Sequence, residues 1–385
     1  MTTEHGNERP RGPAPPIPLT VLTGFLGAGK TTLLNRLVSD EALSDTAVII
    51  NEFGEIGLDH LLVEQVDDKL VLLATGCLCC TMRGDLIGAL EKMLRDLDNG
   101  RVAFRRVVIE TTGLADPAPV IQTTMVHPYL AMRFRLDGII TVVDAVNGEA
   151  TLDAQPEAVK QIALADRIVL TKSDLIDTAE RRASNARLLA RVRSLNPAAP
   201  ILDSSAGAAT PARLLNCGLY DPAEKIPDVK RWLAEEAYPR GDDREAGHAH
   251  AHHRHDINRH DERIRSFSLA TDTAIPASTF EMFIELLRSV HGPNLLRFKG
   301  VVKIAETPET PLVVHGVQHL LHPTTRLESW PDQDHRSRMV FIVRDIEPRK
   351  IRELFDAFLG AMAPDRPDRM AIVDNPLVPF GGPDR

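Results

Sequence analysis

The sequence predicts an α/β fold in which a domain with a mainly parallel sheet precedes a smaller α+β domain. Three observations support this prediction. Over the first half of the chain, short apolar runs typical of buried strands alternate with segments of helical period. A polar, histidine-rich stretch then interrupts the pattern, and strand-like and helix-like segments resume after it in a different order. The length of 385 residues leaves room for two or three domains, each with its own core.

The first domain is expected to run over residues 18–215. Residues 18–23 are β-branched and apolar, as in a buried strand, and a glycine-rich turn leads from them into a helix over 30–38. Because apolar strands stand on both sides of helices, we expect a parallel sheet that is covered on both faces. The other strands expected here are 47–50, 70–74, 106–109, 138–143 and 167–170, with helices over 82–97 and 157–165.

The second domain is expected to run over residues 263–361. It follows residues 216–262, which we interpret as a linker because the stretch 238–263 has almost no large apolar residue. Its expected elements are strands at 264–269, 295–304, 312–317 and 339–343, and helices at 274–290 and 349–359. The proline-rich residues 1–17 are expected to be a disordered leader, and residues 362–385 a loose tail.

Composition argues against several classes of protein. The chain has 45 Lys and Arg against 54 Asp and Glu, a net charge of −9, and only 4% aromatic residues, which disfavours a general nucleic-acid binder. No run reaches the roughly 18 apolar residues that span a bilayer, and the leader lacks the apolar core of a secretory signal. We therefore expect a cytoplasmic protein with no nucleic-acid or membrane partner, whose thiols stay reduced.

Residues 24–31 (GFLGAGKT) fit the pattern G-x-x-x-x-G-K-[ST] between a strand and a helix, which predicts a phosphate-binding loop and the P-loop NTPase fold. Glycines let successive backbone N–H groups point inward at phosphate oxygens, and the helix N-terminus adds positive charge. Lys30 would reach the β- and γ-phosphates, and the Thr31 hydroxyl suits Mg²⁺, a hard ion that prefers oxygen. The nucleotide-binding residues expected in this loop are Gly24, Gly27, Ala28, Gly29, Lys30, Thr31 and Thr32.

Two further segments follow strands and complete the expected nucleotide site. Glu110 ends a strand beside the phosphates, where it could hold Mg²⁺ through a water or position the attacking water, and Gly113 could sense the γ-phosphate. We expect Lys30 and Glu110 to be the catalytic residues. In the sequence TKSD, Asp174 can accept hydrogen bonds from guanine N1–H and the 2-amino group while the Lys172 stem lies along the base. Adenine lacks that donor pair, so Asp174 predicts a preference for GTP over ATP.

A cluster of three cysteines within four residues, Cys77, Cys79 and Cys80, predicts a metal site. Soft thiolates favour Zn²⁺, Cu⁺ or Co²⁺ over Mg²⁺ or Ca²⁺. A fourth ligand could come from Glu52, Glu55, a histidine or a water, and an incomplete cage suits an ion that is later handed over. A redox dithiol and a set of small core residues remain as alternatives.

The linker carries a second candidate metal-binding segment. Its histidines alternate with small or charged residues, and neutral imidazoles suit Zn²⁺, Ni²⁺, Co²⁺ or Cu²⁺. We interpret the segment as a weak collector of several ions, with a solvated linker as the alternative. The histidines concerned are His248, His250, His252, His253 and His255.

These motifs resemble the CobW family of P-loop GTPases. The matching stretches are GFLGAGKTT, NEFGEIGLDH, GCLCC, ETTGLADP, TVVDA, TKSD and WPDQDHRSRMVFI, and the resemblance covers nearly all of the chain except the leader and the tail. Thr171 is a departure, because GTPases more generally carry Asn at that position. The resemblance implies a metallochaperone with a CobW-type C-terminal domain.

The leading hypothesis is a GTP-hydrolysing metallochaperone that delivers a transition metal, expected to be zinc, to a client metalloprotein. Because the cysteine cluster lies between the phosphate loop and Glu110 in the sequence, the nucleotide state could reshape the metal ligands. One alternative is a cobalt chaperone for cobalamin synthesis, since Co²⁺ and Zn²⁺ both accept tetrahedral sulfur sites. The other is a non-catalytic buffer that stores ions on the histidine segment.

Overall fold

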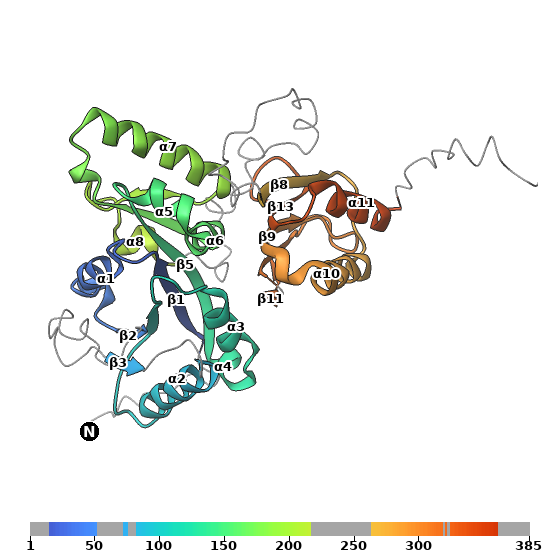
Figure 1. Ribbon diagram of the computed structural model, residues 1–385. Coiled ribbons are helices and arrows are strands. Elements are labelled where there is room, and N and C mark those ends of the chain that lie inside the picture. Colours follow the sequence, from blue (N-terminus) through green and yellow to red (C-terminus); the bar gives the residue numbers. More distant parts are fainter. Residues whose placement is uncertain are drawn as a thin grey trace, which may run out of the picture.

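The chain forms two domains that contact each other (Figure 1). The computed structural model describes residues 15–51, 72–75, 82–216, 263–318, 320–321 and 324–360. Most of the expected leader, most of the expected linker with its histidines, and the expected tail lie outside these ranges.

The first domain is built on a seven-stranded sheet in which every strand pair is parallel. The strand order is β3-β2-β4-β1-β5-β6-β7, so β1 lies at the centre between β4 and β5. All the carboxyl ends therefore meet at one edge of the sheet. The strands are β1 (Ile17–Gly24), β2 (Thr46–Asn51), β3 (Leu72–Thr75), β4 (Arg106–Glu110), β5 (Phe134–Asp144), β6 (Arg167–Thr171) and β7 (Ile201–Asp203).

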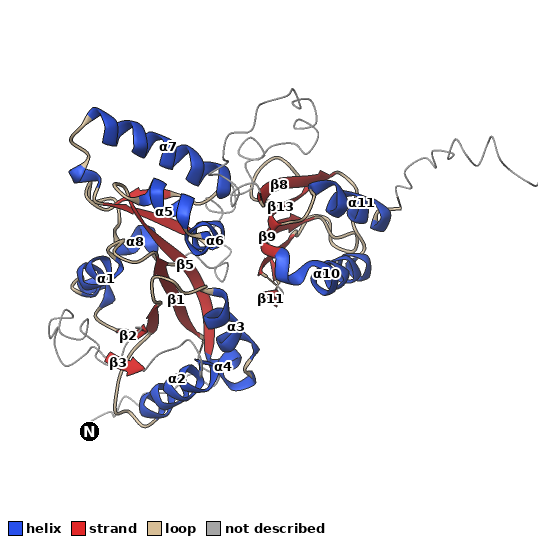
Figure 2. Ribbon diagram, viewed as in Figure 1, coloured by secondary structure: helices blue, strands red, loops and turns tan. Residues whose placement is uncertain are grey.

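Helices cover both faces of this sheet, as its apolar strands require. The helices α1 (Lys30–Val38) and α8 (Pro211–Leu214) pack on one face. The other face carries α2 (Met82–Asp98), α3 (Ala118–Val126), α4 (Pro128–Arg133), α5 (Gly148–Ala154), α6 (Pro156–Leu164) and α7 (Ala179–Leu195) (Figure 2). Two short 3₁₀ helices, η1 (Glu41–Leu43) and η3 (Ser173–Leu175), lie in connections. None of the helices in the described ranges has the length and apolar character that crossing a membrane requires.

The second domain is an antiparallel sheet with two helices on one face. The helix α10 (Ala277–His291) packs beside α11 (Pro348–Phe358), where the ring of Phe283 meets that of Phe355 edge-on at 5.3 Å between centroids. The strand order is β11-β10-β9-β13-β8, and β12 pairs with β10. The remaining elements are β8 (Ile264–Thr271), η5 (Gly292–Asn294), β9 (Leu295–Val302), β10 (Leu312–Val317), β11 (Leu320–Leu321), β12 (Thr325–Arg326) and β13 (Ser337–Arg344).

The predicted fold class is confirmed, whereas several elements were not predicted from the sequence. The longest is α7, in which only Leu188, Val192 and Leu195 are buried among 17 residues, so that its apolar period is weak. The strand β7 has three residues, too few for a periodic pattern. The domain boundaries at 18–215 and 263–361 stay predictions.

The second face of the antiparallel sheet packs against the first domain, mainly on α6 and α7. Its apolar side chains Leu296, Val317 and Ile342 join the same buried cluster as Ala163 and Leu164. Both faces of this sheet are therefore covered, which explains why nearly every residue of β9 and β13 is buried.

A largely buried group of charges lies at this contact. The Asp166 carboxylate binds the guanidinium of Arg297 and the ammonium of Lys299 (2.9 Å), and it also accepts the backbone N–H of Ile139 (3.0 Å). Burial raises the pKa of Asp166, but the two cations outweigh that effect and hold it well below its usual range. Burial lowers the pKa of Lys299 to about 8. Asp166 is thus ionised at neutral pH and neutralised by residues of the other domain.

We predict that Asp166→Asn lowers the free energy of unfolding by about 3–5 kcal/mol, because it leaves the buried Arg297 and the largely buried Lys299 without their carboxylate. Urea denaturation monitored by circular dichroism measures this. The matched control is Asp345→Asn, which removes the exposed pair with Arg263 and should cost less than about 1 kcal/mol. Equal losses in the two variants would contradict the assignment.

Candidate nucleotide-binding site

The phosphate loop joins the end of β1 to the start of α1, and its glycines are required by the backbone. Gly24 has a φ of +143°, and a Cβ at this position would lie 2.4 Å from the carbonyl oxygen of Val142. Gly29 has a φ of +92° at the N-cap of α1, a backbone conformation that residues with a side chain rarely adopt. The loop therefore approaches β5 closely and turns its backbone toward the helix N-terminus, as expected for a phosphate nest.

The side chains expected to contact phosphate and Mg²⁺ come together at the same edge of the sheet. Lys30 Nζ donates to the carbonyl of Phe25 (3.3 Å) and is buried. Thr31 Oγ1 donates to Oε1 of Glu110 (2.9 Å), so the first turn of α1 is joined to the end of β4. Thr32 follows in the same turn and is exposed. The pairing of Thr31 with Glu110 brings together two residues that are 79 positions apart.

The residues that follow Glu110 form a third side of the phosphate site. Gly113 lies directly against the phosphate loop, since a Cβ there would be 2.4 Å from the backbone nitrogen of Leu26. The Thr112 hydroxyl is buried and has no hydrogen-bond partner among the described residues. A buried hydroxyl without a partner fits a site that is completed by a polar ligand such as phosphate or hydrated Mg²⁺.

The segment expected to bind the base is attached to the phosphate loop by hydrogen bonds. Lys172 Nζ donates to the carbonyl of Gly27 (2.7 Å) and to Asp144 Oδ2 (2.7 Å). Thr171 Oγ1 donates to the carbonyl of Ala28 (2.7 Å), so the residue that departs from the common Asn still joins the two segments. Lys172 has a φ of +57°, which is uncommon outside glycine and is found at functional sites.

The base end of the site includes residues that sequence reasoning missed. Asp174 is exposed, and its Oδ1 accepts a hydrogen bond from Ser205 Oγ (2.7 Å), in the loop after β7. Ser173 Oγ donates to Asp203 Oδ1 (2.6 Å), so two bonds hold these loops together. The signal that could have found them is the polar run over residues 203–205 (DSS) directly after an apolar pair at 201–202.

Asp144 at the end of β5 was also missed as a site residue. Burial raises its pKa, yet hydrogen bonds from Lys172, Asn147 and the backbone N–H groups of Val146 and Asn147 together hold it below the usual value. The Asp144 carboxylate is therefore charged at neutral pH and fixes the Lys172 ammonium beside the phosphate loop.

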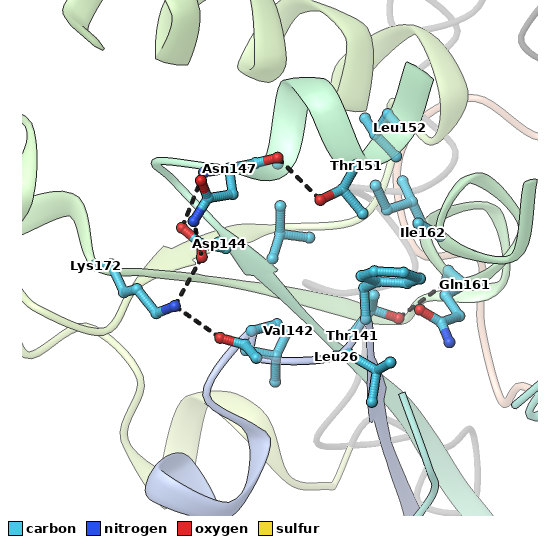
Figure 3. A pocket seen from close by; sticks show the side chains of 16 residues that line it. Leu26, Thr141, Val142, Asp144, Asn147, Thr151, Leu152, Gln161, Ile162 and Lys172 are labelled. Atoms are coloured by element: carbon cyan, nitrogen blue, oxygen red, sulfur yellow. Dashed lines mark hydrogen bonds and ion pairs between the residues drawn. The ribbon is translucent and has the colours of Figure 1, made fainter. Parts of the chain in front are cut away.

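A cavity of about 280 Å³ lies next to these residues, between the phosphate loop and helices α5 and α6 (Figure 3). Most of its lining is apolar, including Phe25, Leu26 and Ile162. Lys172 and Asp144 border it on one side, and Gln161 on the other.

The residues expected to bind the transition metal lie outside the described residues. These are Cys77, Cys79 and Cys80, the candidate ligands Glu52 and Glu55, and the histidines His248, His250, His252, His253 and His255. Within the described ranges, no group of three or more His, Cys, Asp or Glu side chains is arranged to hold a metal ion.

Both domains of the chain match models of known protein families. Residues 18–203 match the family model of the CobW/HypB/UreG nucleotide-binding domain, and residues 264–359 match that of the cobalamin synthesis protein cobW C-terminal domain. The zinc chaperone YjiA of Escherichia coli (strain K12) is 35% identical over 340 residues, which cover 88% of this chain and 98% of YjiA. The zinc chaperone CobW of Pseudomonas aeruginosa is 31% identical over 87% of this chain and 89% of its own length.

Two further similarities agree with these. The zinc-regulated GTPase metalloprotein activator 1 of Schizosaccharomyces pombe is 42% identical over 170 residues, which cover 42% of this chain and 40% of that protein. The crystal structure of Zn(II)-bound YjiA GTPase from E. coli superposes with a TM-score of 0.63 at 29% identity and covers 90% of this chain and 99% of its own.

We predict that Asp174→Asn lowers affinity for GTP by about 10- to 100-fold and improves relative binding of XTP. The amide withdraws the acceptor that the guanine 2-amino group needs and offers a donor that suits the 2-oxo group of xanthine. Competition with a fluorescent GDP analogue measures both affinities. Asp177→Asn, which alters an exposed carboxylate paired with Arg181, is the control and should leave the preference unchanged.

We also predict that Asp144→Asn weakens GTP binding by about tenfold, because a charge-assisted hydrogen bond to Lys172 becomes a neutral one. The pKa of Asp144 is lowered, so its charge is present above the ordinary carboxyl pKa and is lost only as pH falls through the lower folded value. The wild-type to variant affinity ratio should therefore be the same at pH 5.5 and pH 8. A ratio near one at pH 5.5 would contradict this. Asp153→Asn, paired with Arg191 on α7, is the control.

Proposed function

This chain belongs to the CobW family of P-loop GTPases, and from this premise we propose that it hydrolyses GTP in order to deliver zinc to a client metalloprotein. Relatives along most of its length are zinc chaperones, and a further relative is a zinc-regulated GTPase. The observation that carries the proposal is that the phosphate loop, Glu110 and Asp174 lie at the same edge of the sheet at which β3 ends, directly before the cysteine cluster.

The nucleotide half of the proposal assigns each residue a task. The loop of Gly24, Gly27, Ala28 and Gly29 supplies backbone N–H groups to the phosphates, and Lys30 turns from the Phe25 carbonyl to the β- and γ-phosphates. Asp174, held by Ser205, selects guanine. The Gly113 N–H contacts the γ-phosphate, close to Leu26 of the phosphate loop.

Hydrolysis requires a water that is aligned with the γ-phosphorus. Glu110 is buried at the end of β4 and holds the Thr31 hydroxyl, so it can orient water at the phosphates. The water oxygen bonds to the γ-phosphorus, the bond to the β–γ bridging oxygen breaks, and the proton leaves with the inorganic phosphate. Thr31 and Glu110 would hold Mg²⁺, directly or through water, and this ion neutralises phosphate charge when bound.

The metal half of the proposal depends on where the cysteine cluster enters the fold. β3 ends at Thr75, and α2 begins at Met82, so Cys77, Cys79 and Cys80 fall in the short connection between them. β3 is two strands away from β4, which is about 10 Å at the usual strand spacing. The γ-phosphate site is therefore close enough for a change there to affect the segment that would bind zinc.

Zinc is the cargo in this proposal, and the cytoplasm, where thiols stay reduced, is the proposed location. Three thiolates leave one coordination position open, which allows a client ligand to enter before the ion leaves. Cobalt remains chemically compatible with the same thiolates. The relatives that match along most of this chain, YjiA and CobW, are both named zinc chaperones, which favours zinc over cobalt.

We predict that zinc binds at least about tenfold more tightly in the presence of a non-hydrolysable GTP analogue than with GDP, which corresponds to about 1.4 kcal/mol of coupling. Competition with a chromophoric zinc chelator measures the two affinities. By linkage, zinc must strengthen binding of the GTP analogue by the same factor. Equal zinc affinities in the two nucleotide states would reject the proposed switch.

Two variants separate this proposal from storage on the histidines. Cys79→Ser should abolish the nucleotide-dependent binding, whereas Cys217→Ser, the same chemical change at the remaining cysteine, should leave it intact. Deletion of residues 247–260 should reduce the number of weakly bound ions and preserve the nucleotide-dependent site. Loss of the nucleotide-dependent zinc binding in this deletion variant would favour the alternative function, a non-catalytic metal buffer.

A further inference from the structure

Two neighbouring residues of α6 hold the loop that follows Glu110. Gln161 Nε2 donates to the carbonyls of Ala115 (3.0 Å) and Gly113 (3.3 Å), and the Lys160 ammonium forms an ion pair with Asp116. The backbone carbonyl of Gln161 in turn accepts the Thr141 hydroxyl of β5 (2.8 Å). Three contacts made by two side chains therefore define the position of the loop over residues 113–116.

This loop is in direct contact with the phosphate loop. The absence of a side chain at Gly113 lets its backbone approach the backbone of Leu26, where a Cβ would be only 2.4 Å from nitrogen. The Thr112 hydroxyl beside it has no partner among the described residues. A ligand group that binds the Gly113 N–H or the Thr112 hydroxyl therefore affects the same loop whose carbonyls accept hydrogen bonds from Gln161.

The Gln161 amide is satisfied only on its donor side. Its side chain is fully buried, and its Oε1 has no hydrogen-bond partner among the described residues. The amide therefore supplies two donors to the loop over residues 113–116, while its own unpaired acceptor lowers the stability of the fold. Gln161 lines the adjoining cavity, as does Leu26 of the phosphate loop (Figure 3).

The C-terminal end of α6, where Gln161 also lies, contacts both Asn196 at the end of α7 and the C-terminal domain. Asn196 Nδ2 donates to the carbonyls of Ile162 and Ala165 (2.9 Å each), and the Leu164 carbonyl accepts a hydrogen bond from Arg297. Asp166 then binds both Arg297 and Lys299. Gln161 and Leu164 lie in the last turn of α6, about 4.5 Å apart along the helix axis, so a displacement at Gln161 reaches β9 through the Leu164 carbonyl.

We propose that Gln161 is the positioning residue for GTP hydrolysis: it sets the Gly113 loop against the γ-phosphate, and through α6 it transmits the state of that loop to β9 of the C-terminal domain. This inference rests on the proposed GTPase function. Gln161 does not touch the nucleotide, since its amide acts on the carbonyls of Gly113 and Ala115.

The test is Gln161→Leu in the full-length protein, a change that keeps the size of the side chain and removes the amide. We expect kcat for GTP to fall about 10- to 100-fold, because the Gly113 N–H is no longer held in position at the γ-phosphate. Affinity for GDP should stay within about twofold, because GDP lacks the γ-phosphate. A purely structural role would change GDP affinity and thermal stability without a selective loss of kcat.

The matched control is Gln122→Leu. Gln122 lies on α3, and its side chain donates to Gln318 of the C-terminal domain (2.9 Å) rather than to the carbonyls of Gly113 and Ala115, so kcat of this variant should equal that of the wild type. If Gln161→Leu does not fold, Lys160→Met acts on the same loop from a partly exposed position and should give the same selective loss of kcat.

Hydrogen–deuterium exchange of β9 measures the second part of the inference. In the wild-type protein, exchange at β9 should differ between the GDP state and the GTP-analogue state; Gln161→Leu should abolish that difference, and Gln122→Leu should retain it. Equal exchange in the two wild-type states, or an unchanged kcat in Gln161→Leu, would overturn the inference. A wild-type chain that does not hydrolyse GTP would instead overturn the proposed function.

Discussion

The largely buried carboxylate of Asp166 fixes how the two domains are placed. Two residues after the end of α6, it accepts the backbone N–H of Ile139 on β5 and neutralises Arg297 and Lys299 on β9. In an interior of low dielectric, these charges are tolerated only while all of them are together. The position of β9 is therefore set relative to β5 and α6, and Lys160 and Gln161 extend from that same helix to the nucleotide site.

The candidate nucleotide site follows from the parallel sheet. Because every strand runs in the same direction, the phosphate loop, Glu110, Asp144, Lys172 and the loop after β7 all emerge at one edge, although Gly24 and Ser205 are 181 positions apart. Hydrogen bonds then tie the segments pairwise: Thr31 to Glu110, Lys172 to Gly27, and Ser205 to Asp174. A ligand that binds this edge contacts segments from at least four strands and stabilises their arrangement.

A metallochaperone must connect hydrolysis with both metal release and recognition of a client. The proposed site offers two short routes from the γ-phosphate. One runs along the edge of the sheet to the cysteine segment after β3, and the other runs through Gln161 and α6 to the C-terminal domain. Because both begin at the residues after Glu110, a single change in nucleotide state would alter metal affinity and the C-terminal domain together.

The sequence alone predicted the fold class, the phosphate loop and the order of its partner motifs, because glycine spacing and apolar period act over a few residues and determine local backbone conformation. It missed α7, whose apolar face has three buried residues, and β7, which is too short for a period. It also missed Asp144, Ser205, Gln161 and Asp166. Each of these acts through residues that are distant in sequence, so strand order and helix packing decided their partners.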